Sequence, residues 1–327
     1  MTVLGIDLGG TKLAASIFSG EGNVLRSENK AIGSLKRAEV GALISQVVLD
    51  MIGVSDSMGD RVKAIGVSVP GISFSGKGTV WAPNIPGWEN YPLLDELTGV
   101  SGDIPVTIDS DRACYILGEV WQGNARGCRD AVFLAVGTGI GAGILVDGRI
   151  LRGSSDIAGS VGWMALNRPF DDRYSGCGFF EYHSSGEGIG KVARQYLREQ
   201  EDYSGELSSR RVEEITSHDV FAAYHMNDPL AKKIIHECVG YWGMAVANLV
   251  SLLNPEKIIF GGGVFGPAKA LLPAIREEAE KWAQPVSMKQ VTLDTSGLGG
   301  DAGVYGAGYL ALKSIIGNNN LFDKNVQ

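Results

Sequence analysis

Four alternating glycines near the middle of the chain could bind an anion. They connect an apolar run at 131–136 with a second one at 144–146, and they are Gly137, Gly139, Gly141 and Gly143. Because glycine has no Cβ, such a turn can direct successive backbone N–H groups into one concavity. The pattern therefore predicts a phosphate-binding turn. The alternative is that these glycines only bend a hairpin.

The same glycines fit the loose dinucleotide-binding fingerprint G-x-G-x-x-G/A, which requires a helix directly after the turn. Here Asp147-Gly148 separates two short apolar runs, which is the pattern of a tight β-hairpin. The sequence thus favours a glycine turn inside a β-meander over a dinucleotide-binding domain.

Two further glycine turns follow predicted strands. The strand at 2–8 leads into Asp7-Leu8-Gly9-Gly10-Thr11-Lys12, where the carboxylate could hold hydrated Mg²⁺ and the turn could offer N–H groups and a hydroxyl to phosphates. A simple turn is the alternative. Gly261-Gly262-Gly263 lies between a short strand at 257–260 and a helix that we expect to end near Trp282.

A carboxylate suited to proton transfer stands at a strand-to-helix junction. The strand at 104–108 runs into Asp109-Ser110-Asp111, and helical periodicity continues to Gly123. Ser110 or Asp109 could simply cap the helix. Asp111 could instead accept a proton from a substrate hydroxyl during phosphoryl transfer.

Three loops could line a ligand site. The loop at 81–88 (WAPNIPGW) offers two indoles and the amide of Asn84, although a plain surface loop would fit as well. The other two are 153–163 (GSSDIAGSVGW) and 177–181, where a helix opens. Residues 71–77 nearly spell a Walker A loop, but Gly78 stands where a Mg²⁺-binding Ser or Thr is required.

The remaining elements follow from periodicity and from Gly and Pro positions. We expect a helix at 36–52, a strand at 62–69, an exposed excursion near 200–220, a long helix from Pro229 to Leu253, a strand near Val291, a small-residue helix at 301–316 and a frayed tail at 318–327.

Length and composition limit the function classes. With 327 residues the chain is long enough for two cores, and a formal charge of −8 without long basic runs argues against nucleic acid. The N-terminus has no basic region and no apolar run approaches 18 residues, so we expect a cytoplasmic protein without a membrane span. Four cysteines without a C-x-x-C pair read as reduced thiols: Cys114, Cys128, Cys177 and Cys238.

In this order and spacing, the glycine turns and loops resemble the ROK sugar kinases, within the superfamily of actin-like, hexokinase-like and Hsp70-like ATPases. The motifs cover nearly the whole chain and are DLGGTK, PG after VSV, NIPGW, the 111–119 segment, GTGIGAGILVDG, IAGSVGW, FGGGV and DAGVYGAGYLA. The resemblance implies an α/β fold of two RNase H-like lobes with mixed β-sheets and an interlobe cleft. We expect lobes at 1–117, with the helix at 303–317 packing back on it, and at 118–302, followed by the tail at 318–327.

The resemblance also implies roles for individual residues. Asp111 matches the catalytic aspartate that takes the proton of a sugar hydroxyl, commonly on C6, and Asp7 would orient Mg²⁺ through water. The ATP-binding set would be Asp7, Gly9, Gly10, Thr11, Lys12, Gly137, Thr138, Gly139, Gly141, Gly262 and Gly263. The sugar-binding set would be Asn84, Ser110, Asp111, Ser160, Trp163 and Glu181.

The chain departs from the family pattern at its sugar and zinc positions. Ser110 stands where the family has Asn, and Ser160 and Trp163 replace the Glu and His of A-G-E-x-G-H. The zinc cluster C-x-C-G-x-x-G-C-x-E is absent, because its cysteine positions fall on Phe179, Tyr174 and Asp172 while Cys177 is out of register. We therefore expect ATP and Mg²⁺ but no zinc.

Two other functions stay open at this stage. A sugar-sensing regulator of the same family is the main one, although the family's repressors carry a preceding helix-turn-helix and here the phosphate turn starts at residue 7. An ATPase without a sugar substrate would leave the 81–88 loop and Asp111 unexplained. The expected partner is a small-molecule sugar and the expected assembly a homodimer, while the sugar's identity and the phosphoryl donor, ATP or polyphosphate, stay open.

Overall fold

A computed structural model describes residues 1–200 and 202–317, so the predicted tail at 318–327 lies outside the described residues. The chain forms two compact units. The first comprises Met1–Cys128, Gly143–Ala158 and the residues from Ser296 onward, and the second comprises Arg129–Ala142 and Gly159–Thr295. The lobe boundary expected at 117/118 falls inside one helix of the first unit, and that unit also includes the hairpin segment 143–158.

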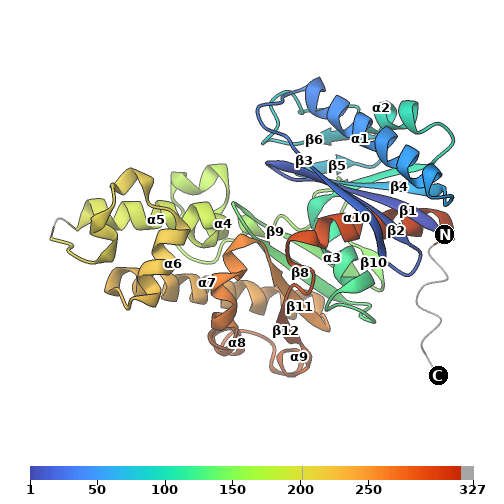
Figure 1. Cartoon of the computed structure of the whole chain (residues 1–327). Coiled ribbons are helices and arrows are strands. Elements are labelled where there is room, and N and C mark those ends of the chain that lie inside the picture. The colour runs from blue at the N-terminus through green and yellow to red at the C-terminus, as the bar shows by residue number, and fades with distance from the viewer. Residues whose placement is uncertain (201, 318–327) are drawn as a thin grey trace. The chain divides into compact units, whose positions relative to one another are not determined.

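The first unit is built on a five-stranded mixed sheet with the order β3-β2-β1-β4-β7 (Figure 1). Strands β1, β2 and β3 are antiparallel, whereas β4 pairs in parallel with β1 and β7. The strands are β1 (Thr2–Leu8), β2 (Lys12–Ser19), β3 (Val24–Ala31), β4 (Val62–Val69) and β7 (Val106–Ser110), with a small hairpin of β5 (Ile72–Phe74) and β6 (Thr79–Trp81). The helices are α1 (Ala38–Ser57), α2 (Leu93–Ser101), α3 (Asp111–Gln122) and α10 (Ala302–Ile316).

Helices α1 and α2 bury their apolar faces in one core with residues of β1, β2 and β4. Helix α1 is long and apolar enough to cross a membrane by length and composition. Its residues Val40, Ile44, Val47, Val48 and Met51 pack in this core. The same arrangement occurs in core helices of globular domains, so the length of α1 alone does not indicate a membrane span.

Helix α10 packs unusually close to β1, β4 and α3, and glycines make this approach possible. A Cβ at Gly66 of β4 would collide with the carbonyl oxygen of Ala307, and one at Gly306 would collide with that of Cys114. The small residues of the predicted 301–316 helix therefore allow α10 to pack closely against β4 and α3.

The second unit contains three parallel strands, with β11 (Lys257–Gly261) between β8 (Ala131–Val136) and β12 (Thr292–Thr295). The full sheet has the order β10-β9-β8-β11-β12. The chain crosses from the second unit into the first within β9 (Ile140–Val146), which forms an antiparallel hairpin with β10 (Arg149–Ile150). Both Asp147 and Gly148 have positive φ, which confirms the predicted tight hairpin.

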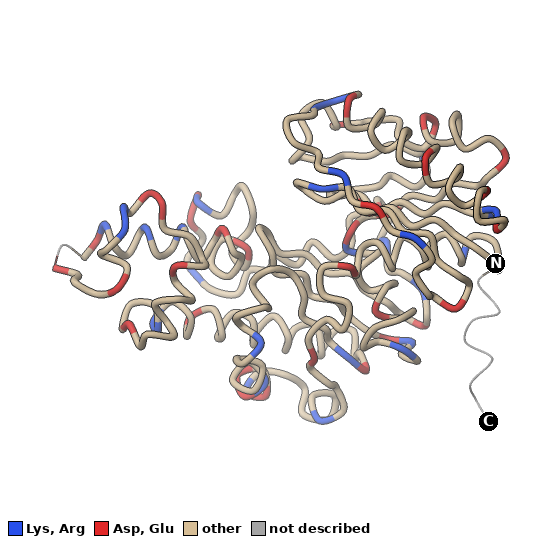
Figure 2. Tube along the Cα trace, in the orientation of Figure 1, with Lys and Arg blue, Asp and Glu red and all other residues tan. Residues whose placement is uncertain are grey.

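The helices of the second unit are α4 (Phe179–Ser184), α5 (Gly186–Glu199), α6 (Ser217–His225), α7 (Pro229–Leu253), α8 (Leu272–Glu280) and α9 (Pro285–Gln290). Helix α7 has the predicted bounds, because Asp228 caps it by accepting from the N–H of Ala231 at 2.8 Å and Asn254 ends it in the left-handed conformation. Acidic and basic positions are interspersed along the described trace of both units (Figure 2).

The expected exposed excursion near 200–220 is wrong in part. Two short 3₁₀ helices and the start of α6 occupy this stretch, and Leu207 and Ile215 are buried. These two apolar side chains are too far apart in sequence to form a periodic pattern, yet they anchor the segment to the rest of the unit.

Candidate active site

Asp111 is the first residue of α3, directly after β7. Ser110 is the N-cap, and its side chain accepts from the N–H of Ala113 at 3.4 Å. This confirms the capping interpretation of Ser110 and leaves the Asp111 carboxylate at the helix N-terminus, where its Oδ1 accepts from the N–H of Arg112 at 2.7 Å.

The surroundings of Asp111 favour proton transfer near neutral pH. Burial raises the pKa of its carboxyl to about 6, and the charge of Asp7 adds to this. The Arg112 guanidinium, the Arg112 N–H and a hydrogen bond with Tyr115 act in the opposite direction. A carboxylate with such a pKa is ionised at pH 7 and still basic enough to take a proton.

Asp7 lies near the end of β1, beside the neighbouring parallel strand. Its Oδ1 accepts from the hydroxyl of Ser68 on β4 at 2.6 Å, and its carboxylate packs so closely on Gly303 of α10 that no Cβ would fit there. Burial is the main cause that raises the pKa of Asp7, and Lys12 lowers it. The carboxyl ends of parallel β1, β4 and β7 thus bring Asp7 and Asp111 to one edge of the first sheet.

The turn after β1 is tight and solvent-accessible. The N–H of Gly9 donates to the carbonyl of Lys12 at 2.9 Å, and Gly10, Thr11 and Lys12 are exposed. The residues of this turn that we predict to bind phosphates are therefore accessible to a ligand.

The 81–88 loop differs from the predicted stacking wall. Trp88 is only 1% exposed, donates its indole N–H to the carbonyl of Arg37 at 2.9 Å and stacks on Tyr91 with ring centroids 4.3 Å apart. It belongs to the core of the first unit and offers no face to a ligand. Asn84 is exposed in the same loop, as a ligand-contacting amide requires.

In the second unit the glycine turn connects β8 and β9. The N–H of Gly137 donates to the carbonyl of Gly139 at 2.9 Å, and the carbonyl of Gly137 accepts from the N–H of Gly186 at 2.7 Å. Gly262, at the end of β11, has a φ of 87° and packs against the carbonyl of Val136, which only a glycine allows. The glycine turns at 137–139 and 261–263 are therefore neighbours. Thr138 and Gly139 lie in the first of these turns, whereas Gly141 lies in β9.

A cavity of about 480 Å³ opens beside these turns within the second unit. Its lining combines glycine backbone with polar and aromatic side chains: Gly137, Thr138, Gly186, Glu187, Gly190, Arg194, Thr216, Ser217, His218, Phe221, Gly263, Val264 and Pro267. The sequence predicted Gly137, Thr138 and Gly263 at a nucleotide site. It missed the lining residues of α5 (Gly186–Glu199), for which the sequence offered no ligand-binding motif, and those at 216–221, most of which belong to the stretch expected to be an exposed excursion.

Glu181, Ser160 and Trp163 also lie in the second unit. The Oε2 of Glu181 accepts from the N–H of Ile140 at 2.6 Å, and burial raises the pKa of its carboxyl. The side chain packs on Gly162, within the 3₁₀ turn Val161–Trp163 that Ser160 precedes. Glu181 therefore links the glycine turn to the loop that carries Ser160 and Trp163, and the Trp163 side chain is 57% exposed.

Among residues 1–200 and 202–317, no group of three or more His, Cys, Asp or Glu side chains could hold a metal ion. An aromatic cluster includes residues at and next to the positions of the family's zinc motif, together with Tyr241 of α7: Tyr174, Phe179, Tyr182, His183 and Tyr241. The ring Nε2 of His183 is 3.1 Å from the hydroxyl of Tyr174, and burial lowers the pKa of His183 to about 4. Ring packing here joins residues 174–183 to Tyr241 of α7.

Residues 3–314 match the profile of the ROK family. The chain belongs to the ROK family. This ROK chain is 32% identical to a glucokinase of Halalkalibacterium halodurans over 94% of both chains, and 30% identical to a glucokinase of Thermotoga maritima over 97% of this chain and 99% of the relative. It is 28% identical to a beta-glucoside kinase of Listeria monocytogenes over 94% of this chain and 97% of the relative.

Solved structures agree with this assignment. A ROK hexokinase from Thermus thermophilus matches with a TM-score of 0.79 at 28% identity, covering 96% of this chain and 99% of that one. A ROK glucokinase from Streptomyces griseus in complex with glucose and AMPPNP matches with a TM-score of 0.72 at 28% identity, covering 95% and 99%. A ROK transcriptional regulator, a homologue of the E. coli MLC protein, matches with a TM-score of 0.81 at 26% identity, covering 94% and 77%.

These likenesses confirm the predicted actin-like α/β fold and identify the ROK chain as a sugar kinase, a phosphotransferase. ATP binding is supported by the AMPPNP-bound relative. The individual roles of the predicted site residues stay predictions, of which Asp7, Gly9, Asn84 and Asp111 lie in the first unit and Gly137, Ser160, Glu181 and Gly262 in the second.

Proposed function

We propose that this protein transfers the γ-phosphoryl group of Mg·ATP to a hydroxyl of a hexose or hexose derivative, on C6, with Asp111 as general base. The observation that carries the proposal is the half-buried Asp111 carboxylate at the start of α3, whose pKa of about 6 suits a base at neutral pH. The names of the relatives support the substrate class.

In the proposed reaction the O–H bond of the sugar breaks, a new O–P bond forms and the bond from phosphorus to ADP breaks. Asp111 takes the hydroxyl proton. Because Oδ1 accepts from the N–H of Arg112 at 2.7 Å, the carboxylate is oriented before the sugar binds. A preoriented base contributes about 10²–10⁴ to the rate of such a step.

Asp7 and the glycine turns supply the proposed nucleotide-binding groups. Asp7 would orient Mg²⁺ through water, and a partly buried carboxylate with one oxygen bonded to Ser68 fits that task. Mg²⁺ would supply charge neutralisation for the phosphates. The turns at Gly9–Lys12 and Gly137–Gly141 would bind phosphates, and the cavity lined by Gly263, His218 and Phe221 would accept adenosine.

The proposed sugar site comprises Asn84, Ser110, Asp111, Ser160, Trp163 and Glu181. Serine can replace one hydrogen bond of the family's carboxylate but not its charge, and the exposed Trp163 ring offers an apolar face for stacking on a pyranose or on a glycoside substituent. The beta-glucoside kinases among the relatives make glycosides a sensible part of any substrate panel. We also propose that the protein works without zinc, in the cytoplasm and as a homodimer, with a sugar rather than nucleic acid as partner.

A sugar-sensing regulator is the second candidate, because a ROK transcriptional regulator is among the matching structures. The two candidates differ in one measurable property. A kinase releases ADP in proportion to sugar, whereas a sensor binds sugar without turnover.

The experiment is an ADP-release screen over monosaccharides and glycosides, with ATP and with polyphosphate as donors. We expect sugar-dependent turnover with ATP for at least one member of the panel. Binding of a sugar by calorimetry without any ADP release would favour the sensor and contradict the kinase.

A further inference from the structure

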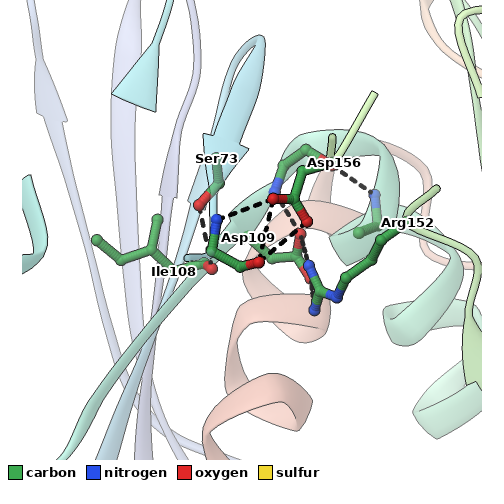
Figure 3. A network of polar contacts seen from close by, with 8 residues as sticks. Ser73, Ile108, Asp109, Arg152 and Asp156 are labelled. Carbon is green, nitrogen blue, oxygen red and sulfur yellow. Dashed lines mark hydrogen bonds and ion pairs between the residues drawn. The ribbon is translucent and has the colours of Figure 1, made fainter. Parts of the chain in front are cut away.

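A buried carboxylate two residues before Asp111 forms an ion pair with a partly exposed arginine. Asp109 on β7 is only 3% exposed, and both of its oxygens accept from Arg152, Oδ1 from Nη1 at 2.8 Å and Oδ2 from Nη2 at 2.6 Å (Figure 3). Such a bidentate pair is both directional and strong. The Oδ1 of Asp109 also accepts from the N–H of Ser110 at 2.8 Å, so the same carboxylate contacts the N-cap of α3.

A second contact holds the segment that carries Arg152. Asp156, four residues later, accepts from the N–H of Ser75 at 3.0 Å and from its hydroxyl at 3.1 Å. Ser75 follows β5, and Ser73 of β5 in turn donates to the carbonyl of Ile108 on β7 at 3.3 Å. Figure 3 shows Ser73, Ile108, Asp109, Arg152 and Asp156 around one point at the end of β7.

This end of β7 has little other support from the sheet. β7 is an edge strand whose neighbour in the sheet is β4, and its last two residues, Asp109 and Ser110, pair there with Ser68 and Val69. An edge strand lacks the second row of ladder hydrogen bonds that would fix a central strand. Besides the β4 ladder and the packing of α3 on α10, the groups that bind Asp109 hold this end of β7 and thereby the start of α3, where Asp111 lies.

We propose that Arg152 is a positioning residue for the sugar-kinase reaction, which fixes the end of β7 through Asp109 and so sets where the Asp111 carboxylate lies. This inference rests on the proposed function of Asp111 as the base. Arg152 comes from a separate stretch, the 151–158 loop, which directly precedes Ser160 and Trp163 in the chain. The loop that leads to the sugar-binding positions thus also holds the strand that leads to the base.

A charged partner is required at this position because Asp109 is almost inaccessible to water. Burial raises the pKa of Asp109, and the Arg152 guanidinium counteracts this. Removing only one member of a buried ion pair leaves an uncompensated charge, whereas replacing both by neutral groups of similar shape is far better tolerated. A lysine keeps the charge but lacks the planar fork that binds both oxygens.

The test compares Arg152→Gln, Arg152→Lys and the double variant Asp109→Asn/Arg152→Gln in the full chain. Arg149→Gln is the matched control, since Arg149 is an exposed arginine on β10, three residues before Arg152. We expect Arg152→Gln to lower kcat roughly tenfold to a hundredfold with KM for ATP changed less than about threefold, because misplacement of a catalytic group by about 1 Å can cost a hundredfold in rate. Arg152→Lys should be intermediate, and the double variant should recover at least about threefold over Arg152→Gln.

A second measurement does not depend on turnover. Amide hydrogen exchange should become faster in peptides covering 106–113 in Arg152→Gln, and should stay unchanged there in Arg149→Gln. A general loss of stability would speed exchange throughout, including α7, so the local pattern separates positioning from folding.

The positioning role would be overturned if Arg152→Gln and Arg149→Gln had equal kcat. It would also be overturned if amide exchange at 106–113 were no faster in Arg152→Gln than in Arg149→Gln. If the unmodified protein shows no sugar-dependent turnover, the proposed function fails by itself. In that case hydrogen exchange still decides whether Arg152 fixes the end of β7.

Discussion

Replacing Asp111 by Asn should remove the general base while keeping the size of the side chain. With a pKa of about 6, roughly nine-tenths of the carboxyl groups are ionised at pH 7, so the base is available in the unmodified protein. Loss of a positioned base lowers kcat by about 10²–10⁴. We expect a decrease of at least roughly a hundredfold, with ATP binding near normal.

The same substitution should not destabilise the fold. The folded-state pKa of Asp111 is raised from 3.8 to about 6, so ionisation opposes folding, and this cost is complete above pH 6. At pH 7–8 the free energy of unfolding of Asp111→Asn should therefore equal that of the unmodified protein or exceed it by up to about 3 kcal/mol. This advantage should shrink as the pH falls from 6 toward 3.8 and be absent below about pH 3, where the carboxyl is neutral in both states.

The assay is coupled ADP release at saturating sugar from pH 5 to pH 8, combined with urea unfolding. In the unmodified protein kcat should fall about tenfold per pH unit below pH 6, and Asp111→Asn should lack this acidic limb. Asp103→Asn, an exposed aspartate before β7, is the matched control. Turnover of Asp111→Asn at the unmodified rate, or an unchanged acidic limb, would remove Asp111 from the mechanism.

Four further outcomes are expected. Glucose, N-acetylglucosamine and N-acetylmannosamine should show kcat/KM at least roughly tenfold below the best sugar of a broad panel. The double variant Ser160→Glu/Trp163→His should shift preference toward glucose-like sugars. Glucose as the best substrate with sub-millimolar KM would refute this. Elemental analysis should find less than stoichiometric zinc, and loss of structure with a zinc-selective chelator would contradict it. Gly66→Ala should cost about 1–3 kcal/mol of unfolding free energy, because its Cβ meets the backbone of α10, whereas Gly53→Ala, on an open helix face, should be neutral or stabilising; equal urea midpoints would refute the packing argument. His183 is held neutral by burial, so the stability it contributes is complete above pH 6.5 and is lost as pH falls toward 4; the urea midpoint of His183→Gln should fall less over that range, and an identical pH dependence would count against this.

Local chemistry was readable from the chain itself. The Asp147-Gly148 hairpin, the Ser110 cap, the bounds of α7 and the placement of Asp111 at a strand-to-helix junction each depend on residues within a few positions of one another. Backbone conformations of glycine and asparagine, capping hydroxyls and proline act over one turn of chain, so a single sequence contains them. The order of the glycine turns then indicated the family, which the comparisons confirmed.

Features that depend on distant segments needed the fold. Trp88 was predicted as part of a ligand wall, but the core under α1 and α2 surrounds it, and nothing in the 81–88 loop alone distinguishes an indole that faces a ligand from one that is buried. The cavity wall from α5 and α6 was missed for a related reason, because it forms only where residues 186–194 and 216–221 meet the glycine turns at 137–138 and 263–264.

The division is clearest around the two carboxylates of the first unit. The sequence alone determined that Asp7 lies near the end of a strand and that Asp111 follows one, which made them candidates for metal binding and proton transfer. Only the tertiary structure decided the pKa of Asp111, since burial sets it, and only it paired Asp109 with Arg152, 43 residues away in the chain. Desolvation and ion pairing depend on which segments share a volume, and that follows from sheet order and packing rather than from neighbours in sequence.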